Sequence, residues 1–457
     1  MENTNKQQQS KFGNWLKTSI TARMLMIGFL IIVLLIPLVF IQDLIRERSY
    51  RQHEVVNEIN QQWGNEVLLY GPILRVPYRS YSEKIITDGK TKKNYTETIE
   101  EVSYAYFFPE TLNIASNINP ELKKRGIYTT AVYNSDIALS GNFVKPNFSE
   151  IEVADKDILW DKAKIIIQSS NVKGVNHADL KIESAEYPLT SKYNAQDNNY
   201  NQSVLHTLET KHISKDLLTF NTPLKFNLNF SIKGSEQIRF IPTGKETLAH
   251  LSSTWKTANF FGEFLPYNDD KISDNGFDAK WKILDLNRPF SQEHFNGIPD
   301  LKDFAFGVNF KIPVDEYQKS ERSAKYGFLV IGLTFLVFFL IQTLSKINIH
   351  PFQYLMIGLA LTMFYTLLVS ISEHSNFLKA YLIAGASVIV LITLYSKSIL
   401  KTFKFPVFIG LSLTALYTFI YVIIQLENYA LLVGSIGLFL ILAIVMFVSR
   451  KIDWNNG

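Results

Sequence analysis

The sequence contains no cysteine in its 457 residues. This absence excludes disulfide bonds, a thiol nucleophile and a zinc site built on thiolates. A small domain outside the cytoplasm often depends on disulfides, so any domain placed there by this chain must be stabilised by its hydrophobic core. We therefore expect a large domain and not a small cross-linked one.

The sequence also lacks an excess of charge of one sign. The formal net charge is +4, and acidic and basic residues are mixed along the chain. A groove that binds nucleic acid would need a concentrated basic surface. We therefore predict that nucleic acid is not a partner.

A third absence concerns five long apolar stretches in the C-terminal part, whose interiors carry no Asp, Glu, Lys, Arg or His. Each stretch is about as long as a bilayer is thick, which predicts a transmembrane helix. The predicted spans are 326–344, 352–371, 380–395, 405–424 and 429–448, within a five-helix membrane domain at 326–449. Ionisable groups inside the membrane mark ion-coupled pathways, so their absence argues against such transport.

The N-terminal part adds a sixth span. Residues 1–23 are polar and predict a flexible cytoplasmic tail, and the apolar residues 24–45 predict a first transmembrane helix. We interpret it as a retained anchor, because the run exceeds a signal peptide and no small-residue cleavage pattern follows it. Apolar residues continue at helical spacing up to Trp63, so 46–66 predict a helical stalk, with a charged linker as the alternative.

Residues 67–325 change to the alternating pattern of β-strands and are predicted to form an extracytoplasmic β domain followed by a linker. Asp88-Gly89 indicates a hairpin turn. The predicted strands include 137–143, 163–168, 180–187, 224–232 and 237–241. We expect an all-β, sandwich-like fold inserted between the first and second transmembrane helices, with one or two units left open.

The distribution of basic residues predicts the orientation. Basic residues concentrate in the loops at 346–350 and 397–404, which alternate with the loops at 372–379 and 425–428. Basic loops remain in the cytoplasm. We therefore expect a multi-pass protein of the bacterial inner membrane with both termini in the cytoplasm, including a tail at 450–457, and with the β domain in the periplasm.

Several motifs closely resemble those of the CreD family, bacterial inner-membrane proteins of cell envelope integrity. They are 314–322, which read VDEYQKSER, together with 350–354, 372–374, 71–78 and 239–242. The resemblance covers nearly the whole chain. It implies a role in envelope stress and integrity, a link to a two-component regulatory system, and no established catalytic activity.

Catalytic, cofactor and metal motifs are not evident, so we predict no catalytic residue, cofactor or metal ligand. Gly244-Lys245 lacks the remaining residues of a phosphate-binding loop, and we interpret it as a turn. The candidate interaction or hinge residues lie at the edges of the membrane domain: Asp315, Tyr317, Gln318, Glu321, Arg322, His350, Gln353, Glu373 and His374.

These candidates carry different expectations. Residues 316–325 are a charged run for which we favour a hinge or docking strap over a merely solvated face. Glu373 and His374 are expected to be hydrated at a helix end, with a pH sensor or a partner contact as the alternative. His350, beside Pro351, is expected to start a helix.

Three classes of function remain. We favour a non-enzymatic protein that acts through partners of its β domain, with membrane lipid and an envelope or membrane protein as expected partners. A transporter or flippase-like protein and a sensor that signals to a cytoplasmic partner are the alternatives. The sequence does not define the oligomeric state.

Overall fold

The computed structural model describes residues 20–87, 94–192, 205–219, 222–295, 297–310, 316–345, 347–400, 403–426 and 429–450. The chain divides into two units, which are described separately. The helical unit comprises Met1–His53 and Val314–Gly457, and the β unit comprises Glu54–Pro313. These boundaries differ from those expected at 46 and 325, because residues 54–63 pack with the strands and residues 316–325 pack with the other helices.

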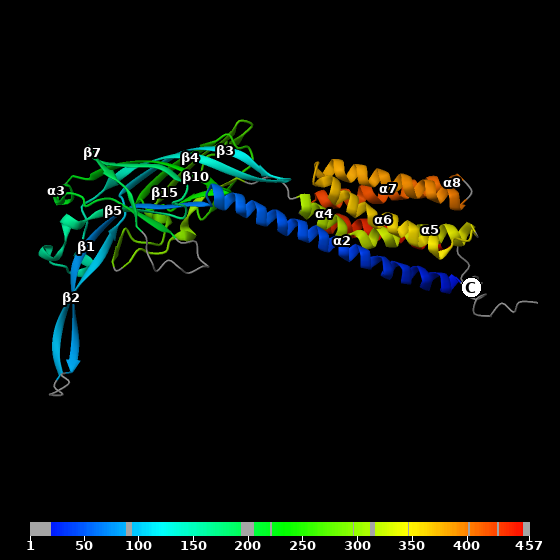
Figure 1. The fold of residues 1–457 in the computed structure, drawn as a ribbon, viewed down its shortest axis with the longest axis horizontal. Coiled ribbons are helices and arrows are strands. Elements are labelled where there is room, and N and C mark those ends of the chain that lie inside the picture. Colours follow the sequence, from blue (N-terminus) through cyan, green and yellow to red (C-terminus); the bar gives the residue numbers. More distant parts are fainter. Residues whose placement is uncertain are drawn as a thin grey trace, which may run out of the picture. The chain divides into compact units, whose positions relative to one another are not determined.

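The β unit contains two sheets (Figure 1). The strands of the nine-stranded sheet are β1 (Val67–Thr87), β2 (Asn94–Phe107), β5 (Lys164–Ser169), β8 (Thr190–Lys192), β9 (His206–Glu209), β11 (Gln237–Phe240), β13 (Ala258–Gly262), β16 (Glu293–Phe295) and β17 (Phe306–Phe310). The strands of the eight-stranded sheet are β3 (Thr111–Arg125), β4 (Tyr128–Phe143), β6 (Val175–Ile182), β7 (Ala185–Pro188), β10 (Leu224–Ser235), β12 (Glu246–Ser253), β14 (Ile272–Ser273) and β15 (Gly276–Leu284).

The strand order shows that both sheets place segments side by side that are distant in the sequence. The first sheet runs β13-β17-β11-β1-β5-β9-β8, with β2 on β1 and β16 on β2, and the second runs β14-β15-β12-β3-β4-β10-β6-β7. Most pairs are antiparallel, but β1 pairs with β11 in parallel and β12 pairs with β3 in parallel. Short helical elements occupy the connections, namely α3 (Lys215–Thr219) and the single turns η1 (Ser149–Ile151), η2 (Asp155–Asp157), η3 (Trp160–Lys162), η4 (Asp285–Asn287) and η5 (Lys302–Phe304).

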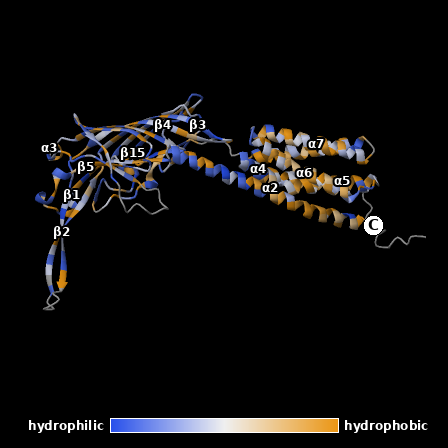
Figure 2. Cartoon of the chain, viewed as in Figure 1, coloured by the Kyte–Doolittle hydropathy of each residue, from blue (hydrophilic) through white to orange (hydrophobic). Residues whose placement is uncertain are grey.

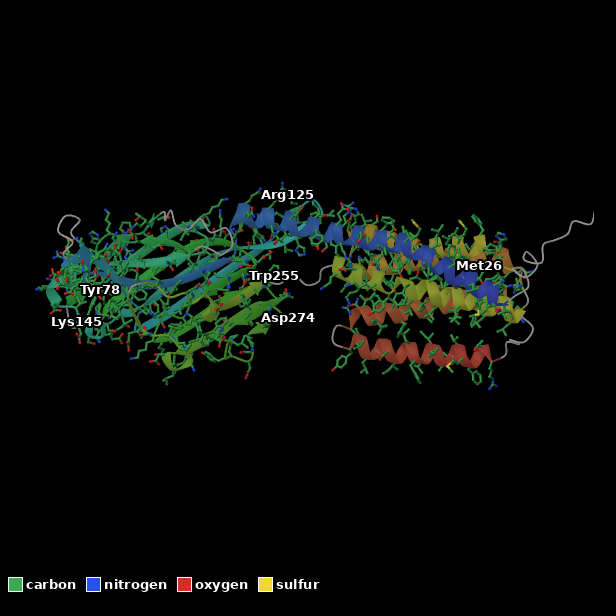
Figure 3. All side chains as sticks on the ribbon, turned by 90° about the horizontal axis from the view of Figure 1, so that it is seen from below. Met26, Tyr78, Arg125, Lys145, Trp255 and Asp274 are labelled. Atoms are coloured by element: carbon green, nitrogen blue, oxygen red, sulfur yellow. The ribbon has the colours of Figure 1, made fainter. Side chains whose placement is uncertain are left out.

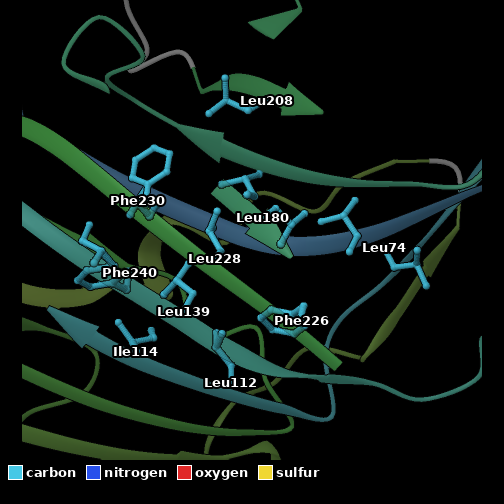
Figure 4. Packing of buried hydrophobic residues seen from close by; sticks show 14 of the residues in the cluster. Leu74, Leu112, Ile114, Leu139, Leu180, Leu208, Phe226, Leu228, Phe230 and Phe240 are labelled. Atoms are coloured by element: carbon cyan, nitrogen blue, oxygen red, sulfur yellow. The ribbon is translucent and has the colours of Figure 1, made fainter. Parts of the chain in front are cut away.

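One hydrophobic core lies between the two sheets (Figure 4). Strand β10 shows how the sequence builds it, because Phe226, Leu228 and Phe230 alternate with exposed residues and point to one face. Leu74 of β1 and Phe240 of β11 contribute from the other sheet. The all-β, sandwich-like prediction is confirmed, and the question of one or two units is answered by this shared core.

The strand predictions differ from the structure at one hairpin. Residues 180–187 were expected to form one strand, but β6 ends at Ile182 and β7 begins at Ala185. Glu183 adopts a positive φ of 51° between them, which is uncommon for a residue with a Cβ. The predicted turn at Asp88-Gly89 lies outside the described residues, although β1 and β2 pair antiparallel up to Thr87 and Asn94.

Helix α2 (Ile20–Trp63) contains the predicted first span and continues without a break through the charged residues after it. Its last residue is followed by Gly64, whose φ is +142° and whose amide donates to the Asn60 carbonyl at 2.8 Å. A Cβ at this position would lie 2.8 Å from the Lys233 carbonyl oxygen. Glycine therefore allows the chain to leave the helix and enter β1.

The helical unit contains α4 (Glu316–Lys325), α5 (Gly327–Ser345), α6 (Pro351–Ser372), α7 (Phe377–Leu400), α8 (Lys404–Gln425) and α9 (Ala430–Ser449), besides residues 20–53 of α2. Within the described part of the chain, six helices are long and apolar enough to cross a membrane, namely α2 and α5 to α9. Figure 2 shows that apolar residues predominate along α5, α6 and α7 and along the first part of α2, whereas the rest of α2 is hydrophilic and the β unit is mixed. Figure 3 shows the same difference, since the side chains of α5 to α9 consist mostly of carbon. The six predicted spans are confirmed.

Small residues let α2 approach its neighbours in the helical unit. A Cβ at Gly327 of α5 would lie 2.7 Å from Leu38 Cδ1, and one at Gly358 of α6 would lie 2.1 Å from Leu34 Cδ1. Leu34 and Leu38 are both buried. Close approach at small residues is typical of packing between membrane helices.

Candidate functional site: the α4 rim of the helical unit

Helix α4 connects the last strand of the β unit to the first helix of the C-terminal bundle. Tyr317, Ser320 and Ala324 are buried, and their spacing of three and four residues places them on one face. Gln318 and Lys325 are exposed. The expected strap is therefore an amphipathic helix, and its buried face contacts the ends of several membrane helices. We call α4 and these helix ends the α4 rim.

The first contact of the α4 rim is made by Glu316. The backbone amide of Phe377, the first residue of α7, donates to Glu316 Oε2 at 2.9 Å. The first amides of a helix have no partner within the helix, and the helix dipole favours a negative charge there. Glu316 therefore supplies both a hydrogen-bond acceptor and the favourable charge for α7.

Arg322 makes the complementary contact at α8. Its Nη2 donates to the carbonyl oxygens of Ile423 and Leu426, each at 3.3 Å. Helix α8 ends at Gln425, so these are carbonyls of its last turn and of the following residue. A positive charge at this end complements the helix dipole. One short helix thus stabilises the N-terminus of α7 and the C-terminus of α8.

Two side chains contact the carboxylate of Glu373, which directly follows the last residue of α6. Tyr317 Oη donates to its Oε1 at 3.1 Å, and Arg48 Nε of α2 lies 3.7 Å from the same oxygen. Its side chain is 15% exposed. The expectation that Glu373 is simply hydrated is wrong, because Tyr317 of α4 and Arg48 of α2 contact its carboxylate and little of the side chain is exposed to water. His374 beside it is exposed.

The remaining contacts of the α4 rim are weaker. Glu321 Oε1 lies 3.4 Å from Arg46 Nε and 3.3 Å from Lys325 Nζ, and both basic side chains are about half exposed. Exposed ion pairs of this kind stabilise proteins little. Gln42 of α2 also donates to the Ala324 carbonyl at 3.1 Å. Arg46 and Arg48 of α2 therefore both lie beside carboxylates.

His350 and Gln353 lie at the other end of α6. His350 is its N-cap, since the Phe352 amide donates to Nδ1 at 3.2 Å and the His350 amide donates to Gln353 Oε1 at 2.9 Å. Helix α6 has 22 residues and is roughly 33 Å long. The structure therefore separates this pair from Tyr317, Gln318, Glu321, Arg322, Glu373 and His374, which it brings to the α4 rim. Asp315 lies outside the described residues.

Sequence reasoning missed Glu316, Gln42, Arg46 and Arg48 as members of the α4 rim. Their partners are 61 to 325 residues away in the sequence, and no local pattern signals such pairs. Among the described residues, no group of three or more His, Cys, Asp or Glu side chains could hold a metal ion. The interactions found at the α4 rim cap helices and join them.

Replacing Tyr317 by Phe should destabilise the helical unit by about 1 kcal/mol, because Glu373 then loses a hydrogen bond in a half-buried position. Thermal unfolding of the full-length protein in detergent should show a lower Tm. Tyr429→Phe is the matched control, since Tyr429 is 64% exposed at the start of α9. Equal Tm values for the two variants would contradict the role given to Tyr317.

Comparison with known proteins adds evidence that is independent of this geometry. A family model described as "Inner membrane protein CreD" matches residues 19–455. The chain is also similar to Inner membrane protein CreD of Escherichia coli (strain K12), with 31% identity over 430 residues. The match covers 93% of this chain and 91% of that protein.

Proposed function

Because this chain belongs to the CreD family of inner membrane proteins, we propose that it supports cell envelope integrity as a non-enzymatic protein whose β unit meets envelope partners. It is a multi-pass inner membrane protein. The observation that carries the proposal is the α4 rim. The chain leaves β17 at Phe310 and enters α4 at Glu316, whose buried face contacts α6, α7 and α8.

The proposed action follows from this connection. In this proposal, a partner bound to the β unit acts on α4, which is the next element after β17 in the sequence. Because α4 supplies capping groups to two membrane helices and a hydrogen bond to a third, a shift of α4 would change the stability of all three ends. In this proposal, α4 transmits the binding of a partner to the membrane helices, and no chemical reaction is required.

The orientation is part of the proposal. The end of the helical unit away from α4 carries Arg23, Lys397, Lys404 and Arg450, and we place this end in the cytoplasm. The basic residues of α2 near α4, Arg46 and Arg48, lie beside Glu321 and Glu373. Pairing with carboxylates reduces their weight as cytoplasmic signals. The β unit and the α4 rim are then periplasmic.

Reporter fusions should test this orientation. Fusions near residues 60, 348, 376 and 402 should report periplasm, cytoplasm, periplasm and cytoplasm, in that order. An alkaline phosphatase and a fluorescent protein, each active in only one compartment, give complementary signals at each position. A reversal at any one of the four positions would reject the orientation.

The role in the envelope needs a cellular test. Cells without the gene should become permeable to a dye and sensitive to osmotic shock, and the wild-type chain should restore both. A photoreactive residue at Ile85 or Leu286, which are 70% and 90% exposed on the β unit, should capture an envelope component in the restored cells. Leu382 on α7, which is 60% exposed, is the control position. An unchanged envelope in the deleted strain would contradict the proposal.

A transporter or flippase-like protein is the second candidate. It is favoured by an apolar cavity between α5, α8 and α9. Reconstituted protein that moves a solute or a labelled lipid across liposomes in a gradient-dependent way would support it over the first. A sensor role would instead require that a cytoplasmic partner binds the inner loops, which pull-down from membranes can test.

A further inference from the structure

A groove of about 800 Å³ lies within the helical unit, between α5, α8 and α9. Most of its lining residues are Leu, Ile, Val or Phe, and Leu336 of α5, Leu416 of α8 and Leu440 of α9 represent the three walls. Its volume falls within the range of roughly 300–1,000 Å³ that is typical of small-molecule sites. In a membrane, the acyl chains of the lipids are the solvent next to such a groove.

The groove extends along only part of each helix. It includes residues 333–345 of α5, 404–419 of α8 and 437–448 of α9. At 1.5 Å per residue these segments are roughly 17–23 Å long. The hydrocarbon core of a bilayer is about 30 Å thick, so the groove corresponds to one leaflet and its headgroup region.

One end of the groove is polar and basic. Lys404 and Ser345 line it there, and Lys404 is exposed. The same end of the helical unit carries Lys397 at the end of α7 and Arg450 after α9. The described residues at this end, namely 20–25, 345, 347–351, 396–400, 403–404 and 449–450, include no Asp or Glu. An anionic headgroup would therefore meet positive charge.

The lining chemistry favours a lipid over another helix. Contacts between membrane helices are enriched in small residues that let backbones approach, as Gly358 of α6 does against Leu34 of α2. Most side chains that line the groove are instead large branched or aromatic ones. None of the described residues of α9 is buried, so this helix leaves its apolar surface available beside α5. Flexible acyl chains can fill such an irregular apolar space.

We propose that this groove binds an anionic phospholipid of the leaflet on the Lys404 side. The acyl chains lie between α5, α8 and α9, and the phosphate lies at Lys404. This site is distinct from the α4 rim, which lies at the other end of the same helices. The proposal does not depend on which partner the β unit binds.

Native mass spectrometry of the delipidated full-length protein tests this. The protein is mixed with equal amounts of phosphatidylglycerol, which is anionic, and phosphatidylethanolamine with the same acyl chains. The wild type should retain more phosphatidylglycerol, and Lys404→Gln should reduce that excess by roughly fivefold, as expected for one basic residue near an anionic headgroup. Lys379→Gln, at the opposite end of α7, is the control and should keep the excess.

A second variant tests the acyl-chain part. Ala415→Trp fills the groove from α8 and should remove bound lipid of both kinds, whereas Leu411→Trp, on the exposed surface of the same helix, should not. If Ala415→Trp does not give a monodisperse protein, Leu440→Trp fills the groove from α9. Phosphatidylglycerol retained equally by the wild type, Lys404→Gln and the folded tryptophan variant would overturn the proposal. A dimer that the tryptophan variant abolishes would instead assign the groove to a second copy.

Discussion

Replacing Glu209 by Gln is expected to destabilise the β unit by about 3 kcal/mol. Glu209, at the end of β9, accepts hydrogen bonds from Arg75 Nη2 and Lys164 Nζ, each at 2.7 Å. The three side chains are only 10%, 16% and 20% exposed. Glutamine removes the negative charge and leaves two cations partly buried without it. The cost of such uncompensated charges exceeds that of losing a surface pair.

The contribution of Glu209 depends on pH with a definite sign. Burial acts to raise the pKa of the Glu209 carboxyl, but the hydrogen bonds and charges of Lys164 and Arg75 lower it below the ordinary value of 4.5. A lowered pKa in the folded state means that the stabilisation is complete above 4.5 and is lost as the pH falls through the lower, folded value. The difference between the wild type and Glu209→Gln should therefore shrink in acid.

Urea unfolding of the full-length protein in detergent, followed by tryptophan fluorescence, measures this effect. Trp160 and Trp281 are buried in the core of the β unit and report its unfolding. Glu186→Gln is the matched control, because Glu186 pairs with Lys181 at 3.1 Å but its side chain is 75% exposed. If both variants unfold at the same urea concentration, the arrangement around Glu209 does not stabilise the fold.

Replacing Arg322 by Gln is expected to destabilise the helical unit by about 2 kcal/mol and to impair function while leaving membrane insertion intact. The carbonyls of Ile423 and Leu426 lose a charged donor that also complements the dipole of α8. Replacing Glu321 by Gln should change stability by at most about 0.5 kcal/mol, because its pair with Arg46 is exposed to solvent. The structure thus separates two residues that the charged run 316–325 presents as equivalent.

Thermal unfolding in detergent, membrane fractionation and restoration of a deleted strain give the three readouts. Insertion should be the same for the wild type, Arg322→Gln and Glu321→Gln, whereas only Arg322→Gln should lower the Tm and fail to restore the envelope. Full activity of a double variant that neutralises Glu321 and Arg322 would refute a functional role for α4. If Glu321→Gln alone loses activity without a lower Tm, the function of the α4 rim does not depend on the stability of the helical unit.

The membrane helices and the alternating strands could be predicted because their signals are local. A continuous apolar run identifies α5 or α9, and residues such as Phe226, Leu228 and Phe230 reveal β10. The β6–β7 turn was not predictable, since Glu183 adopts a conformation that glycine or asparagine would normally signal. The parallel pairing of β1 with β11 also has no sequence signature, because it joins segments roughly 170 residues apart.

The α4 rim could be predicted only in part. The charged run marks the place, and Tyr317, Arg322 and Glu373 were identified as candidates, but their partners were not. Glu316 stabilises a helix that begins 61 residues later, and Arg48 reaches Glu373 from the other end of the chain. Hydropathy also places Glu373 at a helix end and therefore predicts hydration, whereas packing brings a tyrosine and an arginine to it.

The parallel pairing of β1 with β11 has a consequence for the biogenesis of the protein. Strand β1 is synthesised directly after α2 and pairs over residues 74–87 with β2, which follows at once, but the strand that pairs with residues 67–69 begins only at Gln237. At roughly 5–20 residues per second, a ribosome needs on the order of 10–30 s to reach that residue. During this interval residues 67–69 of β1 lack this partner, and unpaired backbone groups at a strand edge can pair with other chains. The nine-stranded sheet is therefore completed only after β11 and β17 have been synthesised.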